Sequence, residues 1–245
     1  MQVIPIKTRV LTPPKDDLFS VLDEALPELI EKDIVVVTSK VVAIGEGRCV
    51  PAGTAREKES LIAKEADYLA RLKGSRRSLF SIKGNAVVGS AGIDDSNGNG
   101  YWILWPKDPM KSAREIWKHL RRRHGVRRLA VVITDSYSPP MRLGTLGVSI
   151  GFFGFHPVED HVGKKDIFGR KFVYSRSNLA DGIASSAVLV MGETDERQPI
   201  ALLRGVPSLR FSTSDTAREL LIPPREDIYY PLLKPLYDQR ARGKH

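Results

Sequence analysis

The sequence predicts a globular protein built from both helices and strands. Short runs rich in valine and isoleucine alternate along the chain with longer segments whose apolar residues recur every three or four positions. Of the 245 residues, 42% are hydrophobic and 27% are charged, which is typical of a folded protein with a sizeable core. The sequence contains no internal repeat and no low-complexity segment.

The chain before the glycine-rich segment at residues 89–100 begins with two predicted strands and two predicted helices. Residues 3–6 and the β-branched run 34–37 have the composition of strands. Residues 16–30 and 56–73 carry apolar side chains at helical spacing, so each is predicted to form an amphipathic helix. A glycine-bearing turn is expected at residues 45–48.

The second half of the chain repeats this alternation. Strands are expected over residues 129–133, 144–154 and 200–203, and helices over residues 110–120 and 179–191. Four glycines alternate with apolar residues in 144–154, which indicates a strand in tight contact with another backbone. The tail from Pro223 onward is rich in Pro, Tyr, Leu and Arg, and we expect it to wrap the surface.

The chain is strongly basic, with a net charge of +9 and a pI near 9.6. A basic protein favours anionic partners, and nucleotides, phosphorylated metabolites and nucleic acids all qualify. The densest basic segment, RRRHGVRR at residues 121–128, follows a predicted helix and contains Gly125 as a candidate C-terminal cap. Cations suit a last helical turn, and no nucleic-acid-binding signature accompanies them. We therefore expect no nucleic-acid partner.

The sequence favours a cytoplasmic protein that acts away from membranes. No apolar run approaches the roughly 20 residues needed to span a bilayer. The N-terminal residues lack the long apolar region and small-residue cleavage site of a signal peptide. Cys49 is the single cysteine, so an internal disulfide and a cysteine-based zinc site are excluded.

An acidic, glycine-rich loop, GSAGIDDSNGNG at residues 89–100, is the first candidate site. Apolar runs precede and follow it, so Asp94, Asp95, Ser96 and Asn97 would be displayed between two short strands. Loops held by rigid elements often carry functional residues. The same residue types also form ordinary turns, so the loop by itself leaves a turn and a metal site equally open.

Further polar residues follow predicted strands and helices. Ser39 and Lys40 follow residues 34–37, Asp135 and Ser136 end the strand that begins at Leu129, and Glu193 follows the helix at residues 179–191. The chain has no P-loop, no complete dinucleotide fingerprint and no histidine pair at metal-ligand spacing. Oxygen ligands remain, and they suit Mg²⁺ or Mn²⁺ held between carboxylates and phosphates.

Several short motifs occur together in one order. They are EGR at residues 46–48, AGIDDSN at 91–97, ITDS at 133–136, GKKDIFGR at 163–170, MGE at 191–193 and a strand ending in Arg204-Gly205. Together they resemble the coenzyme F-420-0:gamma-glutamyl ligase family. The resemblance extends from about residue 3 to residue 205, which is most of the chain.

The resemblance implies an α+β fold with mixed and antiparallel sheets, flanking helices and two intertwined subdomains without a clean sequence boundary. It implies a homodimer and a GTP-dependent enzyme that joins L-glutamate to the lactyl carboxylate of a deazaflavin phosphodiester, an anionic small molecule. The implied cofactors are two Mg²⁺ or Mn²⁺ ions with GTP as co-substrate, and K⁺ is a further candidate.

The resemblance also implies roles for individual residues. The divalent-metal ligands would be Asp94, Asp135, Ser136 and Glu193. The nucleotide contacts would be Ser39, Lys40, Asn97 and residues 191–198, among them Met191, Gly192, Glu193 and Thr194. The catalytic group would comprise Asp94, Asp135 and Arg142, where Arg142 is chosen, like Lys165 and Arg170, for its charge and position near anionic substrate groups.

Two departures from the family pattern leave alternatives open. Ile44 stands where the family usually has a lysine, and Pro139 stands where an arginine is usual. A cation aimed at a phosphate contributes to binding and catalysis, so these changes bear on substrate choice. The alternatives are a ligase of the same fold with another acceptor or amino acid, and a homologue that binds metal and nucleotide without turnover.

Overall fold

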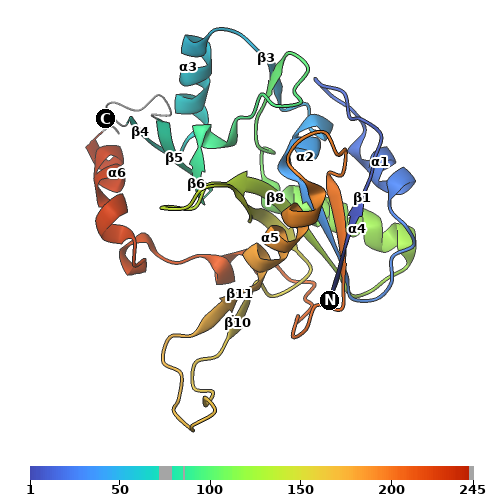
Figure 1. Cartoon of the computed structure of the whole chain (residues 1–245), viewed down its shortest axis with the longest axis vertical. Helices are drawn as coiled ribbons and strands as arrows, with labels where there is room; N and C mark the ends of the chain where they lie inside the picture. Colours follow the sequence, from blue (N-terminus) through green and yellow to red (C-terminus); the bar gives the residue numbers. More distant parts are fainter. Residues whose placement is uncertain (72–78, 85, 243–245) are drawn as a thin grey trace.

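The computed structural model describes residues 1–71, 79–84 and 86–242 (Figure 1). Its centre is a five-stranded mixed sheet in the order β1 (Gln2–Ile6), β12 (Ile200–Arg204), β2 (Asp33–Thr38), β8 (Leu129–Tyr137) and β9 (Leu146–Phe153). Strands β2 and β8 are parallel, and the other neighbouring pairs are antiparallel. The α+β class with mixed and antiparallel sheets is therefore confirmed.

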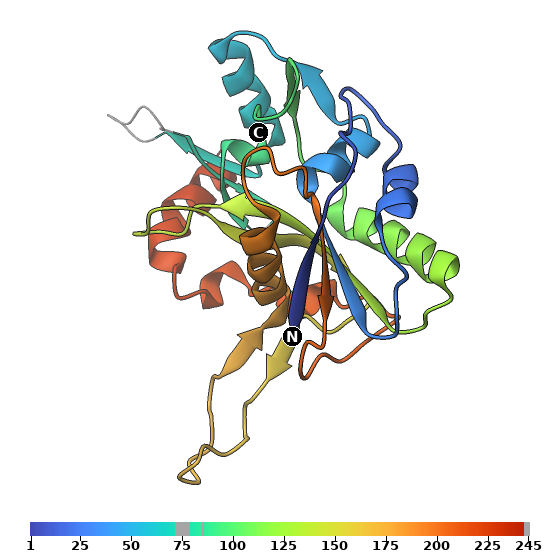
Figure 2. The ribbon, with the colours of Figure 1, turned by 45° about the vertical axis from the view of Figure 1, so that its right-hand side comes forward.

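Helices cover both faces of this sheet (Figures 1 and 2). On one face, α1 (Leu18–Ala25), α2 (Ser39–Gly45) and α4 (Pro109–His124) share a core with Val35 and Val37 of β2. On the other face, α5 (Leu179–Met191) shares a core with Ile34 and Val36 of the same strand. Because both faces of β2 are buried, its sequence is a continuous apolar run and not an alternating one.

The glycines of β9 allow helices to approach the sheet closely, as the sequence predicts. A Cβ atom added to Gly147 would collide with the carbonyl oxygen of Ala184 in α5. One added to Gly151 would collide with the carbonyl oxygen of Pro109 at the start of α4. Strand β9 is therefore pressed between two helices at positions where only glycine fits.

Residues 49–105 contribute a second, smaller group of elements. It comprises α3 (Ala55–Glu65), the pair β3 (Cys49–Pro51) and β7 (Tyr101–Ile103), and the antiparallel strands β4 (Tyr68–Arg71), β5 (Leu79–Lys83) and β6 (Ala86–Gly89). These elements have a separate core that includes Ile62, Ile93 and Trp102. The division of the chain into two intertwined subdomains stays a prediction.

Two features extend from the main body (Figures 1 and 2). Strands β10 (Val158–Asp160) and β11 (Arg176–Asn178) form a long hairpin, which we call the arm (residues 158–178). Past the short 3-10 helices η2 (Ala217–Leu220) and η3 (Pro224–Glu226), the chain ends in α6 (Tyr230–Arg242). Within α6, Tyr237 packs edge-on against Tyr68 of β4, with ring centroids 4.7 Å apart.

The structure corrects two predicted helices. The helix predicted over residues 16–30 ends at Ala25, because Leu26 precedes Pro27 and takes an extended backbone. The helix predicted over residues 56–73 ends at Glu65, and Tyr68–Arg71 instead forms β4 beside β5. Residues 72 and 73 lie outside the described residues. Pairing with β5 overrides the helical spacing of Leu69 and Ala70.

The basic segment at residues 121–128 has a structural role in the fold. Its first four residues form the last turn of α4, and Gly125 caps the helix in the left-handed conformation, with φ of 69°. Arg121 lies over the Trp117 ring at 4.3 Å, and Arg128 pairs with Glu31. The predicted basic helix end is confirmed. None of the helices in the described part of the chain has the length and apolar character that crossing a membrane requires.

Candidate functional site

The parallel pair β2 and β8 places two polar segments at one edge of the sheet. The last register pair is Thr38 with Thr134, and polar residues lie at the carboxyl end of each strand: Ser39 follows β2, and Asp135 and Ser136 are among the last residues of β8. Ser39 donates a hydrogen bond through Oγ to Oδ1 of Asp135 at 3.0 Å. Ligands of open sheets that contain parallel strands bind at this edge, so the strand order itself creates a site.

Asp135 is held among protein atoms at this edge. Its second oxygen, Oδ2, accepts a hydrogen bond from the indole nitrogen of Trp105. Desolvation raises the pKa of Asp135 to about 6, and the nearby charge of Asp94 acts in the same direction. The hydrogen bonds from Trp105 and Ser39 oppose this shift because they stabilise the ionised form.

The acidic loop delivers Asp94 to the same edge. Lys40 donates through Nζ to the carbonyl oxygen and Oγ of Ser96, and it forms an ion pair with Oδ2 of Asp94 at 2.8 Å. Ser96 also donates its backbone N–H to Oδ1 of Asp94 at 2.8 Å. Desolvation raises the pKa of Asp94, but its interactions with Lys40 and Ser96 outweigh this effect, and the pKa lies below its ordinary value.

The end of α5 supplies the opposite wall. Oγ of Ser136 donates to both carboxylate oxygens of Glu193, at 2.9 and 3.1 Å. The side-chain amide of Asn97 donates to the carbonyl oxygen of Thr194 at 2.9 Å, which joins the acidic loop to the segment after α5. Gly192 has φ of 80°, which favours glycine at the turn between α5 and Glu193.

These segments surround an open cavity of about 730 Å³. Its walls come from the ends of β2, β8 and α5, from the acidic loop and from residues 8–11, which precede α1. The cavity has the size of a small-molecule site, and its donors and acceptors converge from segments distant in sequence. Lys40 and Arg9 line it beside backbone and hydroxyl donors, and the carboxylates of Asp94, Asp135 and Glu193 line it too, so the cavity offers donors for an anion and acceptors for a cation.

Comparison with known protein families identifies this chain. Residues 5–205 match the family model described as F420-0:Gamma-glutamyl ligase. The chain belongs to this family. A coenzyme F420:L-glutamate ligase from Methanopyrus kandleri is 34% identical over 248 residues, which cover 94% of this chain and 96% of that protein. The protein of the same name from Methanothermobacter thermautotrophicus is 30% identical, covering 86% of this chain and 90% of that protein. The chain is accordingly an amide-bond-forming ligase.

Most of the site residues predicted from the F420-0:gamma-glutamyl ligase pattern line this one cavity. They are Ser39, Lys40, Asp94, Asn97, Asp135, Ser136, Met191, Gly192, Glu193 and Thr194. Arg142 does not: it is exposed in the loop between β8 and β9, apart from the residues that line the cavity. Lys165 and Arg170 belong to the exposed end of the arm. The roles of all these residues stay predictions.

Two residues at the candidate site were absent from the sequence prediction. Trp105 binds Asp135 although it ends an apolar segment, YWILW at residues 101–105, that reads as core. Arg9 lines the cavity and binds Asp16 through two hydrogen bonds of 2.9 and 2.8 Å. Arg9 follows the first strand at its carboxyl end, and this position was the available signal.

The donors in the cavity fit a divalent ion in chemical type. Asp94, Asp135, Glu193 and Ser136 offer oxygen atoms only, which Mg²⁺ and Mn²⁺ prefer. Each carboxylate already accepts hydrogen bonds from protein donors. Within the residues that the structure describes, no three His, Cys, Asp or Glu side chains form a ready metal cluster. The donor chemistry therefore fits, and the binding of a metal is a proposal.

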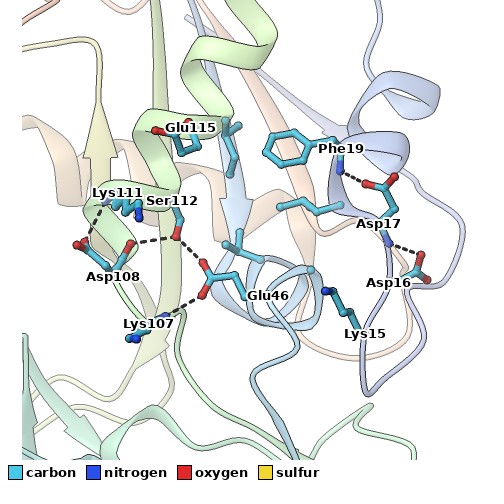
Figure 3. Close-up of a pocket in the computed structure, with 14 residues that line it drawn as sticks. Lys15, Asp16, Asp17, Phe19, Glu46, Lys107, Asp108, Lys111, Ser112 and Glu115 are labelled. Atoms are coloured by element: carbon cyan, nitrogen blue, oxygen red, sulfur yellow. Dashed lines mark hydrogen bonds between the residues drawn. The ribbon is translucent and has the colours of Figure 1, made fainter.

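A second cavity, of about 1000 Å³, lies between α1, α2 and α4 (Figure 3). Its carboxylates are already committed to local donors. Glu46 accepts from the backbone N–H of Lys107 at 2.8 Å and from Oγ of Ser112, and Asp108 caps α4 by accepting from the backbone N–H of Lys111. Asp17 caps α1 in the same way. Asp17 and Asp108 cap helices, and Glu46 binds groups at the start of α4, so these three carboxylates have partners without a ligand.

Proposed function

We propose that this ligase joins L-glutamate to a carboxylate of a coenzyme F420-0-like anionic acceptor, with GTP as co-substrate and divalent metal ions. The single observation that carries the proposal is the convergence of three carboxylates with Ser39 and Lys40 in one cavity. Hydroxyl and ammonium donors suit phosphate oxygens, and the carboxylates suit the cations that accompany phosphates. Relatives named coenzyme F420:L-glutamate ligase are similar in sequence to this chain over most of its length.

The reaction proceeds in two steps. An oxygen of the acceptor carboxylate attacks the γ-phosphorus of GTP, the bond to the GDP oxygen breaks, and an acyl phosphate forms. The amine of L-glutamate then attacks the acyl carbon, phosphate leaves with the bonding electrons, and the nitrogen loses a proton. This route makes phosphate the group that leaves the acyl carbon, whereas direct attack on the carboxylate would have to expel oxide, which is a poor leaving group. Transfer of a phosphoryl group depends mainly on positioning and on neutralising charge.

The chain's own residues have distinct tasks in these steps. Asp94, Asp135, Ser136 and Glu193 would hold Mg²⁺ or Mn²⁺, which when bound supplies positive charge beside the phosphate oxygens. Lys40 is placed to neutralise phosphate charge once the nucleotide competes with Asp94 for its ammonium group. Asn97 links the acidic loop to the segment after α5, so it fixes the width of the cavity.

Mass spectrometry tests the proposal directly. The protein is incubated with Mn²⁺, L-glutamate, the deazaflavin acceptor F420-0 and either GTP or ATP, and glutamyl addition is measured. Asp135→Asn should abolish turnover. Asp95→Asn is the matched control, because Asp95 adjoins Asp94 but lies outside the cavity, where it pairs with Lys58 at 2.9 Å. Full activity of the Asp135→Asn variant would contradict the site assignment.

One observation favours a different acceptor as the second candidate. Ile44 is buried, with 3% of its surface exposed, and it lines the cavity at a position where the family usually has a lysine. An apolar side chain there favours a less anionic acceptor group. Tight GTP binding without addition of glutamate to F420-0 would support this candidate. A panel of other carboxylate acceptors and amino acids would then identify the pair.

We further propose that the ligase works as a homodimer in which the arm provides contacts. The end of the arm exposes Ile167 and Phe168 almost completely, with 92% and 90% of their surfaces accessible. Tyr174 is 85% exposed on the same arm. Apolar side chains gathered on a projecting hairpin are typical of a protein-protein interface, and a second copy of the chain is the partner that the family resemblance implies.

A further inference from the structure

Asp135 is fixed from two sides by donors that differ in origin. Ser39 approaches Oδ1 from the start of α2, and the indole N–H of Trp105 approaches Oδ2 from the segment after β7. Trp105 is buried, with 3% of its surface exposed. An indole donates one hydrogen bond and accepts none, so Trp105 can orient the carboxylate without competing for a cation.

Three residues hold Trp105 in place, two of them at its ring and one at its backbone. Gly92 has φ of 71°, and a Cβ at this position would collide with the indole nitrogen. Lys83 places its ammonium group 5.6 Å from the ring centroid. Arg48 donates through Nε to the carbonyl oxygen of Trp105 at 3.2 Å. The indole therefore has little freedom to rotate away from Asp135.

Two of these residues, Lys83 and Arg48, are themselves fixed by a partly buried ion cluster. Lys83 and Arg48 both bind Oε2 of Glu65, at 2.7 and 2.8 Å. The side chains of Lys83 and Glu65 are each 15% exposed. Shared charge-assisted hydrogen bonds of this length restrict all three side chains, and the cluster connects the end of α3 with β5 and the residue before β3.

We propose that Trp105 is a positioning residue for Asp135, held in place by Gly92 and by the cluster of Arg48, Glu65 and Lys83. It fixes the carboxylate so that the oxygen lone pairs left free by Trp105 and Ser39 face the cavity. Donors behind a ligand of this kind orient it and tune its basicity. The inference rests on the proposed function for its catalytic consequence, but the contact with Asp135 is independent of the substrate.

The alternative is that Trp105 is only a core residue. Its buried N–H would then require some hydrogen-bond acceptor, and Asp135 would merely be the nearest one. Trp117 provides the matched control for this alternative. It is also buried, with 7% of its surface exposed, and its indole donates to the carbonyl oxygen of Leu129 at 2.8 Å, within the main core. Trp105→Phe and Trp117→Phe each delete one buried indole donor, so both should lower the free energy of unfolding.

Three measurements on the full chain separate the two explanations. Trp105→Phe should weaken Mn²⁺ binding in calorimetry and lower kcat, each by about tenfold or more, with the KM for glutamate nearly unchanged. In the metal-free protein, carbon-13 NMR of the Asp135 carboxyl should show a pKa above the wild-type value, because a donor to the ionised form has been lost. Trp117→Phe should change none of these quantities.

The results of these measurements distinguish a positioning role of Trp105 from a purely structural one. Equal losses of stability in both variants, with the Asp135 titration unchanged in Trp105→Phe, would overturn the proposal. If the wild-type protein shows neither Mn²⁺ binding nor turnover, the proposed function fails, and the NMR titration still decides whether Trp105 positions Asp135. Lys83→Met should produce a smaller change of the same kind, because it removes one contact that holds the ring.

Discussion

Asp94 and Asp95 are adjacent carboxylates whose surroundings give them different roles. Asp94 pairs with Lys40 inside the cavity, whereas Asp95 pairs with Lys58 on the surface, where 65% of the Asp95 side chain is exposed. Sequence reasoning chose Asp94 because the family motif aligns it with a metal ligand. The composition of the loop could not distinguish the two carboxylates, because the distinction depends on which lysine each one meets in the folded chain.

Glu31 is a second carboxylate whose surroundings determine its behaviour. It accepts the backbone N–H groups of Arg127 and Arg128, at 2.6 and 3.0 Å, and the guanidinium of Arg128. These donors hold the pKa of Glu31 at about 2, below its ordinary 4.5. The folded state therefore binds fewer protons than the unfolded state between these two pH values.

Glu31→Gln should consequently change how stability depends on pH. In the wild-type protein, the contribution of Glu31 is present above pH 4.5 and is lost as the pH falls toward 2. In the variant this loss is absent, so the difference in unfolding temperature between the two proteins should shrink as the pH is lowered through this window. Glu28→Gln is the control, because the Glu28 side chain accepts no hydrogen bond from the described residues. A constant difference across the window would contradict the prediction.

Among the elements, β9 is the one whose packing was predicted from a sequence pattern. The glycine spacing predicted close contact with another backbone, and α4 and α5 provide it on either side. By contrast, the sequence did not predict α2: a turn was expected only over residues 45–48, because the apolar residues 41–44 form a continuous run without helical periodicity. Helix α6 was also missed, since Pro235 in its interior is a strong signal against a helix.

Gly147→Ala and Gly151→Ala should each lower the free energy of unfolding by about 1–3 kcal/mol, because the added methyl group meets backbone carbonyl groups. Urea denaturation measures the change. Gly182→Ala is the matched control: it lies in α5, nothing is within 4 Å of an added Cβ, and alanine is the better helix former. The expectation fails if all three substitutions have the same effect.

At the scale of the molecule, the sequence predicted that polar residues lie at the strand ends, but it did not predict which strand ends meet in space. Ser39 and Asp135 each follow an apolar strand, a local signal that sequence contains. Their meeting depends on the parallel pairing of β2 with β8, which no local pattern specifies. Arg142 was predicted from its charge and its position in the sequence, but the loop between β8 and β9 leaves it exposed to solvent.

The arm offers a test of assembly for the whole molecule. Replacing both Ile167 and Phe168 by serine should weaken the proposed homodimer about tenfold or more, because these side chains are the apolar end of the arm. Sedimentation velocity over a range of protein concentrations measures the change. The control replaces Val10 and Ile30 by serine, since these are also exposed, at 60% and 52%, but lie elsewhere. Unchanged association in the arm variant would remove the arm from the interface.

The contacts that build the candidate site have a consequence for folding. The bond between Ser39 and Asp135 joins residues 96 positions apart, and that between Asn97 and Thr194 joins residues 97 apart. Each contact closes a long loop, which is entropically costly until the central sheet has formed. A fragment that lacks β8 or the segment after α5 therefore loses one of these two contacts. During refolding, the ability to bind ligand should therefore return together with the slowest phase of sheet formation, and no earlier.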